Sequence, residues 1–307
     1  MRIVFMGSPD FALPSLQVLL ENGYNVGAVV TVPDKPAGRG LRQTASSVKK
    51  FAIQRGLPLL QPEHMADSNF IAGLEKLKAD LFVVVAFRIL PPKVFQLPGL
   101  GSFNLHASLL PKYRGPAPIN WAIIRGENET GVTTFFLRER VDTGDIILQK
   151  KITIGQDDTA GELHDKLSVA GAQLVLQTVR MIEDGTVESN PQSDSGSTNA
   201  PKIRRDDCRI RWSMDASEIH NLVRGLSPKP TAFGYHGNTL LKIYRTRILS
   251  DSGGHEYGTV LRVEEVFEIA TGNGSVEIME IQQEGKKRMT AREFLRGYSL
   301  REGDRLS

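Results

Sequence analysis

Strand-like and helix-like segments alternate through residues 2–86, and this alternation limits the folds open to the chain more than any other feature. The short apolar runs that predict buried strands are Arg2–Met6, Val26–Val32 and Leu81–Ala86. Helix patterns lie between them, at Ala12–Glu21, at Ser47–Arg55 and from Asp67, a capping residue, to about Lys76. Repeated strand–helix–strand units imply a mostly parallel α/β sheet with helices on both faces and ligands beyond the carboxyl ends of the strands.

The pattern changes in the second half of the chain, whose 307 residues exceed the usual size of one domain. Thr159–Asp184 predicts a long amphipathic helix, and the polar stretch Ser189–Thr198 predicts an interdomain linker. The segments that follow are a short helix pattern at Ala216–Arg224 and strand-like runs at Leu240–Tyr244, Tyr257–Val263 and Gly274–Ile281. Short strands broken by Gly-rich turns are typical of a small β-barrel, so we expect a second, all-β domain.

Cysteine content and charge narrow the class of protein. The single cysteine, Cys208, excludes an intrachain disulfide and suits a reducing cytoplasm. The longest apolar run, Leu81–Phe87, is far shorter than the roughly 20 residues that span a bilayer, so we expect a soluble protein without a membrane partner. The net charge of +3 arises within residues 202–307. That excess permits a polyanionic partner, but it also fits an ordinary surface of mixed charge.

The common nucleotide and metal motifs are missing from the sequence. Gly7 follows the first expected strand, but the residues after it do not form the Gly-x-Gly-x-x-Gly of dinucleotide sites, and no phosphate-binding loop is present elsewhere. Gly7 more modestly allows a tight turn and a close approach to the backbone. The histidines lack ligand spacing such as His-Glu-x-x-His, so we expect no metal.

The segment Phe103–Pro116 carries the most chemistry. Asn104 and His106 alternate along an expected strand end, so their side chains project from the same face. A carboxamide beside an imidazole can stabilise an oxyanion and transfer a proton. A lone histidine is nevertheless more often a packed or surface residue, so His106 by itself is weak evidence of catalysis.

A second polar cluster, Arg140–Asp145, lies between two strand-like runs. A carboxylate such as Asp142 could orient an imidazole and raise its basicity. The run Asp-Thr-Gly-Asp is also good chemistry for a plain hairpin turn, and spacing alone favours that simpler interpretation.

Taken together, the two clusters resemble the folate-dependent formyltransferases. The shared pattern is Asn-x-His-x-Ser-Leu-Leu-Pro-x-Tyr-Arg-Gly, which begins at Asn104, followed by Val-Asp-Thr-Gly-Asp at residues 141–145. The resemblance implies a formyl donor, 10-formyltetrahydrofolate, and a catalytic triad of Asn104, His106 and Asp142. It further implies contacts to folate from Ser108, Leu109, Leu110 and Pro111 and, beside the pterin, from Phe87 and Arg88. At this last place the family carries Ala-Tyr-Gly, whereas this chain has Ala-Phe-Arg.

Three further segments resemble those formyltransferases that act on methionyl-tRNA. They are the opening strand and turn Val4–Ala12, the Gly/Pro-rich loop Pro33–Gly40 and the stretch Ala216–Pro228. The resemblance implies initiator methionyl-tRNA as partner, with Arg39 and Arg42 contacting its acceptor end. Where the family's loop ends in Ser-Pro-Val-Lys, this chain has Ser-Ser-Val-Lys at residues 46–49, without the proline.

The resemblance implies a Rossmann-like catalytic domain over residues 1–190, a linker over 191–204 and a tRNA-binding domain over 205–307. The last is expected to be a β-barrel that resembles an oligonucleotide-binding (OB) fold. We expect a cytoplasmic monomer in which the amine attacks the formyl carbon, Asn104 and His106 stabilise the oxyanion, and Asp142 orients His106. Two alternatives stay open: a formyltransferase for glycinamide ribonucleotide or an amino-sugar nucleotide, and a folate- or RNA-binding module without turnover.

Overall fold

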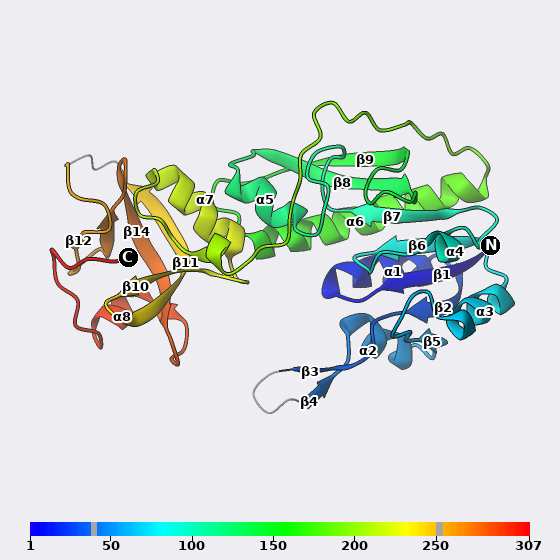
Figure 1. The fold of residues 1–307 in the computed structure, drawn as a ribbon, viewed down its shortest axis with the longest axis horizontal. Coiled ribbons are helices and arrows are strands. Elements are labelled where there is room, and N and C mark those ends of the chain that lie inside the picture. Colours follow the sequence, from blue (N-terminus) through cyan, green and yellow to red (C-terminus); the bar gives the residue numbers. More distant parts are fainter. Residues whose placement is uncertain (38–41, 250–253) are drawn as a thin grey trace. The chain divides into compact units, whose positions relative to one another are not determined.

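The computed structural model describes residues 1–37, 42–249 and 254–307 (Figure 1). These residues form two compact units. The first unit comprises Met1–Gly115, Thr130–Ile152 and His164–Asn199, and the second comprises Pro116–Glu129, Thr153–Leu163 and Ala200–Ser307. The domain bounds expected from the sequence, 1–190 and 205–307, stay a prediction.

A seven-stranded, mostly parallel sheet is the framework of the first unit, as predicted. Its order is β5-β2-β1-β6-β7-β8-β9, and the pairs from β5 to β7 are parallel, whereas β8 runs antiparallel to β7. The strands are β1 (Arg2–Gly7), β2 (Asn25–Val30), β5 (Leu59–Leu60), β6 (Leu81–Val85), β7 (Ser102–His106), β8 (Glu129–Phe136) and β9 (Ile146–Thr153). A separate antiparallel pair consists of β3 (Lys35–Ala37) and β4 (Arg42–Thr44).

Two of the helices between these strands begin at side-chain caps, and one of these caps, Asp67, was predicted from the sequence. Asp67 accepts a hydrogen bond from the Phe70 backbone N at 2.8 Å, and Ser46 accepts one from the Lys49 N at 3.0 Å. The proline that the loop lacks is therefore not needed to start the helix after Ser46. The elements are η1 (Asp10–Ala12), α1 (Leu13–Glu21), α2 (Ser47–Gln54), α3 (Ser68–Leu77), α4 (Pro92–Phe95), α5 (Pro118–Ile124) and α6 (Ala160–Glu183), the last confirming the expected long helix.

The central strands are buried because helices cover them. All five residues of β6 are buried, as is β1 after its first residue. On one face, Val4, Met6 and Val84 share a core cluster with residues of α3 and α4, among them Phe70, Leu74, Val94 and Phe95. Gly7 pairs with Val85, and Val85 pairs with Leu105, so the carboxyl ends of three parallel strands meet at one edge. That edge is where ligands of such sheets bind.

An antiparallel sheet dominates the second unit, in the order β10-β11-β14-β13-β12 with β15 beside β14. Its apolar residues form a separate core with those of α7 and α8, including Ile219, Val223, Leu241, Phe267 and Phe294. The elements are η2 (Asp206–Cys208), α7 (Ala216–Leu226), β10 (Ala232–His236), β11 (Thr239–Leu249), β12 (Val260–Arg262), β13 (Glu268–Ala270), β14 (Ser275–Gln283), β15 (Met289–Thr290) and α8 (Ala291–Leu295).

The expected barrel is confirmed only as this antiparallel sheet. The last residues run close to both of its outer strands: Tyr235 and Ser307 exchange two backbone hydrogen bonds, of 2.7 and 2.8 Å, and the Val260 N donates to Asp304 O at 2.8 Å. These contacts are isolated bridges rather than a continuous ladder. In the part of the chain that the structure describes, the sheet is therefore not a closed barrel.

The first turn of α6 is held by a capping box between Thr159 and Glu162. The Glu162 carboxylate accepts hydrogen bonds from the Thr159 N at 2.8 Å and from its hydroxyl at 2.7 Å, and it pairs with Arg245 at 2.6 Å. Burial works against ionisation of this carboxyl, but the hydrogen bonds from Thr159 and Arg245 outweigh it and lower the pKa of Glu162 to about 2.

We predict that Glu162→Gln destabilises the protein by about 1 kcal/mol at pH 7, the size of one capping interaction, because solvent screens the half-exposed pair with Arg245. A carboxyl whose folded pKa of about 2 lies below the ordinary 4.5 stabilises fully above pH 4.5, and its contribution fades as the pH falls toward 2. The difference in urea-unfolding free energy should thus be smaller at pH 3.5 than at pH 7. The exposed Glu188→Gln is the control, and an unchanged difference at pH 3.5 would contradict this account.

Candidate active site

Asn104 and His106 lie two residues apart in β7, so both side chains project from the same face of the sheet. The strand is paired on both sides there, since Asn104 lies opposite Val84 of β6 and opposite Phe135 of β8. His106 is buried and Asn104 is half-buried. The side-by-side carboxamide and imidazole expected from the spacing are therefore set on a rigid element.

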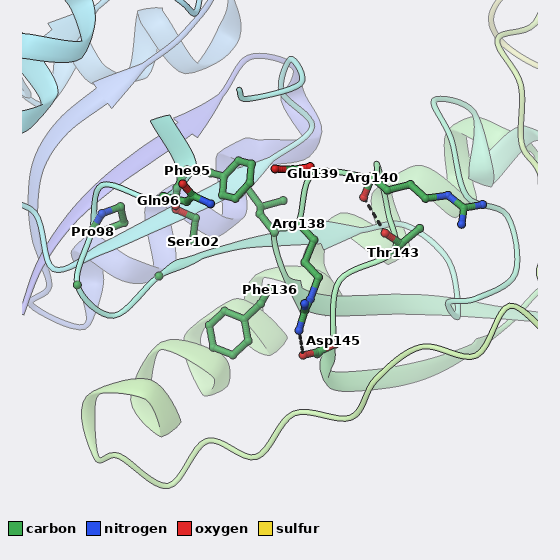
Figure 2. Close-up of a pocket in the computed structure, with 13 residues that line it drawn as sticks. Phe95, Gln96, Pro98, Ser102, Phe136, Arg138, Glu139, Arg140, Thr143 and Asp145 are labelled. Carbon is green, nitrogen blue, oxygen red and sulfur yellow. Dashed lines mark hydrogen bonds and ion pairs between the residues drawn. The ribbon is translucent and has the colours of Figure 1, made fainter. Parts of the chain in front are cut away.

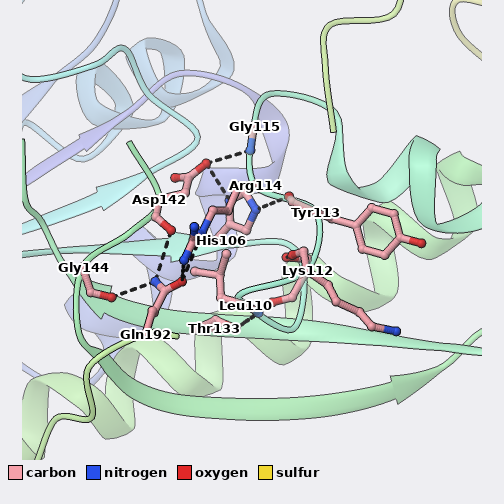
Figure 3. A network of polar contacts seen from close by, with 11 residues as sticks. His106, Leu110, Lys112, Tyr113, Arg114, Gly115, Thr133, Asp142, Gly144 and Gln192 are labelled. Atoms are coloured by element: carbon pink, nitrogen blue, oxygen red, sulfur yellow. Dashed lines mark hydrogen bonds and ion pairs between the residues drawn. The ribbon is translucent and has the colours of Figure 1, made fainter. Parts of the chain in front are cut away.

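The Asp142 carboxylate reaches His106 from a different segment. Its Oδ2 lies 3.9 Å from His106 Nδ1 and accepts a hydrogen bond from the Gly115 N at 2.8 Å (Figure 3). Asp142 has a φ of 55°, in the left-handed region, and the Thr143 hydroxyl donates to Arg140 O at 2.8 Å within the same turn. The segment is thus a tight turn, as the simpler interpretation held, and that turn also delivers a carboxylate to the histidine.

The second nitrogen of His106 has a backbone partner. Nε2 lies 2.9 Å from Tyr113 O, and because a carbonyl oxygen only accepts hydrogen bonds, we assign the proton to Nε2. Nδ1 is then the nitrogen that gains or loses a proton, and it faces Asp142. When Nδ1 is also protonated, the imidazolium faces a carboxylate.

The Ser108–Pro111 segment forms a turn anchored to the neighbouring strands. The Thr133 hydroxyl donates to Ser108 O at 2.6 Å, and the Gln149 amide donates to Leu110 O at 2.9 Å. The Ser108 hydroxyl donates to Lys112 O at 2.6 Å inside the turn. Ser108 and Leu110 are buried, whereas Leu109 and Pro111 are half-buried. Their folate contacts stay a prediction.

A small cavity of about 90 Å³ brings Asn104 and Asp142 together with Phe87 and Arg88. The Arg88 guanidinium lies over the Phe87 ring and donates to Pro62 O and Glu63 O, so it is held in place by its own neighbours. The remaining walls were not predicted from the sequence, and only Ile89 and Val141 directly neighbour residues that were. These walls are Val84, Ile89, Leu90, Phe95, Phe135, Leu137, Arg138, Glu139 and Val141.

A larger and more open hollow, of about 750 Å³, adjoins this cavity and shares Phe95, Leu137, Arg138 and Glu139 with it (Figure 2). Arg138 pairs with Asp145 at 2.7 Å in its wall. Neither Asn104, His106 nor Asp142 lines this hollow. We therefore take the smaller cavity as the candidate ligand site despite its size, because Asn104 and Asp142 line it.

The expected tRNA contacts cannot be placed. Arg39 lies outside the described residues, and of Arg42 only the backbone, in β4, is described. Within the described ranges, no group of three or more His, Cys, Asp or Glu residues is arranged to hold a metal ion. Among those same residues, no helix combines the length and apolarity needed to cross a bilayer.

Residues 1–179 match the model of the formyl transferase family, and residues 202–299 match that of the formyl transferase C-terminal domain. The chain belongs to the formyl transferase family. The resemblance expected from Asn104, His106 and the Asp142 turn is confirmed at the level of the family, while the roles of the individual residues stay predictions.

The relatives extend over nearly the whole chain. It is 45% identical to a methionyl-tRNA formyltransferase of Porphyromonas gingivalis and 46% identical to one of Bacteroides fragilis, each over 98% of this chain and 96% of the relative. Among solved structures, an N-formyltransferase from Helicobacter canadensis, in complex with folinic acid and dTDP-3-aminofucose, is similar with a TM-score of 0.70 at 24% identity. That match covers 90% of this chain and 98% of the other, and at such identity it supports the fold alone.

The turn that carries Asp142 depends on Gly144. A Cβ added at Gly144 would lie 1.6 Å from Phe136 O, which only a backbone shift could relieve. We predict that Gly144→Ala destabilises the protein by about 1–3 kcal/mol and lowers formyl transfer, because the turn must move away from β8. Gly73→Ala in α3, where a Cβ meets nothing within 4 Å, is the matched control and should keep or slightly raise stability. Urea unfolding and initial rates decide, and wild-type values for Gly144→Ala would rule out this reading of the turn.

Proposed function

We propose that this enzyme transfers the formyl group of 10-formyltetrahydrofolate to the α-amino group of methionyl-initiator tRNA, as a cytoplasmic monomer. The observation that carries the choice of acceptor is the identity of about 45% over nearly the full length to methionyl-tRNA formyltransferases. The chemistry is supported by three side chains: a half-buried carboxamide, a buried imidazole and a carboxylate that faces the imidazole.

In the proposed reaction, the amine nitrogen bonds to the formyl carbon, and the bond from that carbon to the folate nitrogen then breaks. The amine loses a proton, and the folate nitrogen gains one. Asn104 donates a hydrogen bond to the developing oxyanion, and His106 supplies positive charge or a proton beside it. Asp142 faces Nδ1 of His106, holds the ring in this orientation and stabilises the imidazolium.

The small cavity is the proposed site for the pterin of the donor. Its walls are largely apolar and aromatic, from Leu90, Phe95 and Phe135, and its polar groups include Asn104 and Asp142. A flat heterocycle with hydrogen-bonding edges suits such a lining. Phe87 and Arg88, which replace the family's Tyr-Gly, form the wall where this chain should differ from its relatives in pterin contacts.

We predict that Asn104→Ala, His106→Ala and Asp142→Ala each lower kcat about 10²–10³-fold, because each removes or misdirects a group that acts on the oxyanion. Combined variants should lose little more than the single ones, since the three act as a unit. Asp145→Asn is the control, because this carboxylate of the same turn pairs with Arg138. Single-turnover transfer to charged initiator tRNA is the measurement. Full activity in His106→Ala would refute the proposed mechanism.

For the second unit, we propose that residues 205–307 form a tRNA-binding domain with an OB-like fold, in which residues 304–307 bridge the two outer strands of the sheet. The support is a groove of about 490 Å³ lined by Arg209, Arg211, Tyr257 and Arg305, with the Arg305 guanidinium over the Tyr257 ring at 5.7 Å. Arginines beside an exposed aromatic ring suit a nucleic-acid strand, because they offer charge to phosphates and a face for stacking. The same region carries the positive excess of the chain.

We predict a division of labour between this groove and the Arg39 loop. Replacing Arg209, Arg211 and Arg305 with Ala should weaken initiator-tRNA binding and flatten its salt dependence by about one unit of slope for each lost phosphate contact. Arg39→Ala should instead lower the transfer rate, with folate binding intact. Arg292→Ala, exposed on α8, is the control. Filter binding over a range of salt tests this, and a triple variant with the wild-type slope would refute the assignment of the groove.

The acceptor itself is open to a direct assay. Release of tetrahydrofolate can be followed with charged initiator tRNA, with glycinamide ribonucleotide and with a dTDP-amino sugar. Turnover only with the tRNA is the expected result. Turnover with either of the others would favour the alternative acceptor, and no turnover with any would favour a binding module.

A further inference from the structure

The polar stretch after α6 is hydrogen-bonded to neighbouring segments of the candidate site at both of its ends and at Gln192. We call residues 190–199, all in the first unit, the strap. At one end Asn190 exchanges two backbone hydrogen bonds of 2.8 Å with Ile146 of β9. At the other end Thr198 accepts from the backbone N of Arg114 and, through its hydroxyl, from that of Tyr113, both at 2.9 Å. The strap therefore spans from β9 to the turn whose carbonyl holds His106.

Gln192 connects the strap to the Asp142 turn. Its amide nitrogen donates to two backbone carbonyls of that turn, Asp142 O at 3.1 Å and Gly144 O at 2.7 Å (Figure 3). Its amide oxygen accepts from Arg114, from Nη2 at 2.9 Å and from Nε at 3.3 Å. Both hydrogens and the oxygen of this carboxamide are thus used.

Arg114 is in turn held by the strap. Its side chain is only 9% exposed, and Nη1 pairs with Asp194 at 2.6 Å. Arg114 also directly precedes Gly115, whose N–H holds the Asp142 carboxylate. One guanidinium and one carboxamide therefore tie the turn at residues 113–115 to the turn at residues 140–145.

Asp142 needs such a restraint. Its left-handed backbone, with φ of 55°, is uncommon for a residue with a side chain. The carboxylate reaches His106 and Gly115 from this conformation. Fixing the carbonyls of Asp142 and Gly144 with one donor group fixes the peptide planes on the carboxyl side of Asp142, and with them the direction of its side chain.

We propose that Gln192 is a positioning residue, which keeps the Asp142 carboxylate directed at His106 by donating to the carbonyls of Asp142 and Gly144, and that Arg114 orients Gln192 for this task. The inference rests on the proposed catalytic roles of His106 and Asp142. It assigns to the strap a function in the reaction, in addition to joining segments of the chain.

The residue type provides a sharp test. Gln192→Glu keeps an oxygen for Arg114 and the length of the side chain, but it removes the donors to the two carbonyls and directs negative charge at them. Gln192→Ala removes both functions. If the donors position Asp142, both variants lose kcat alike; if Gln192 only anchors the strap through Arg114, the Glu variant retains activity.

We expect kcat to fall about tenfold in Gln192→Glu and in Gln192→Ala, because a small misplacement of a catalytic group lowers the rate while substrate binding is kept. The KM values for the folate and the tRNA should stay within about twofold. Ser197→Ala, exposed in the same strap, is the matched control and should behave as wild type. Thermal unfolding of each variant tests whether the fold is kept. If the Ala variant does not fold, Gln192→Glu alone provides the test of the positioning role.

A double-mutant cycle with Asp142→Asn separates positioning from general stability. If Gln192 acts through Asp142, then Gln192→Glu has little further effect on kcat in the Asp142→Asn background. Multiplying effects, or wild-type kcat in Gln192→Glu, would overturn the inference. Should Asp142→Asn alone keep full activity, the proposed catalytic role of Asp142 fails. If Asp142→Asn loses activity while Gln192→Glu stays active, the catalytic role of Asp142 is kept and only the positioning role of Gln192 is refuted.

Discussion

The carboxylate of Asp142 joins its own turn to two earlier segments, the end of β7 and the turn at Gly115. It lies 3.9 Å from His106 at the end of β7, accepts from the Gly115 N at 2.8 Å, and belongs to the turn between β8 and β9. A carboxylate that close to a buried imidazole fixes the ring only if both are themselves fixed. The parallel sheet fixes His106, and the turns around residues 113–115 and 140–145 fix Asp142, so the site depends on how closely these turns pack.

Close packing explains why glycine occupies positions 7 and 144, neither of which belongs to a cofactor-binding motif. A Cβ on Gly144 would overlap the Phe136 carbonyl, so only glycine lets the Asp142 turn lie against β8. A Cβ on Gly7 would lie 2.8 Å from the Ala12 Cβ and 3.0 Å from Val85 O. Gly7 therefore allows the chain to turn tightly at the end of β1, where a dinucleotide-binding protein would place a phosphate loop. The carboxyl edge of the parallel strands can therefore bind a ligand other than a dinucleotide.

The sequence predicted those parts of the fold whose residues follow a regular helical or strand period or a recognisable capping pattern. β1, β6 and α6 are long or apolar enough to show their period, and Asp67 is a cap that can be read directly. By contrast α5 has only seven residues, too few for a helical period, and it was not predicted from the sequence. The same-face placement of Asn104 and His106 followed from alternation. The approach of Asp142 to His106 did not, because tertiary packing brings together segments 36 residues apart, and only family resemblance indicated it.

Gln192 shows why the polar contacts around Asp142 could not be predicted from the periodic pattern of the sequence. A residue whose task is to donate to two backbone carbonyls and accept from a guanidinium needs neither burial in an apolar core nor a periodic position. A segment built for such contacts is rich in Gln, Asn, Ser and Asp, which is also the composition of a solvated linker. The composition of a segment shows that it can form hydrogen bonds. Only the fold determines whether water or a neighbouring turn supplies the partners. In this chain the polar stretch after α6 is therefore the place where a positioning group escapes sequence analysis.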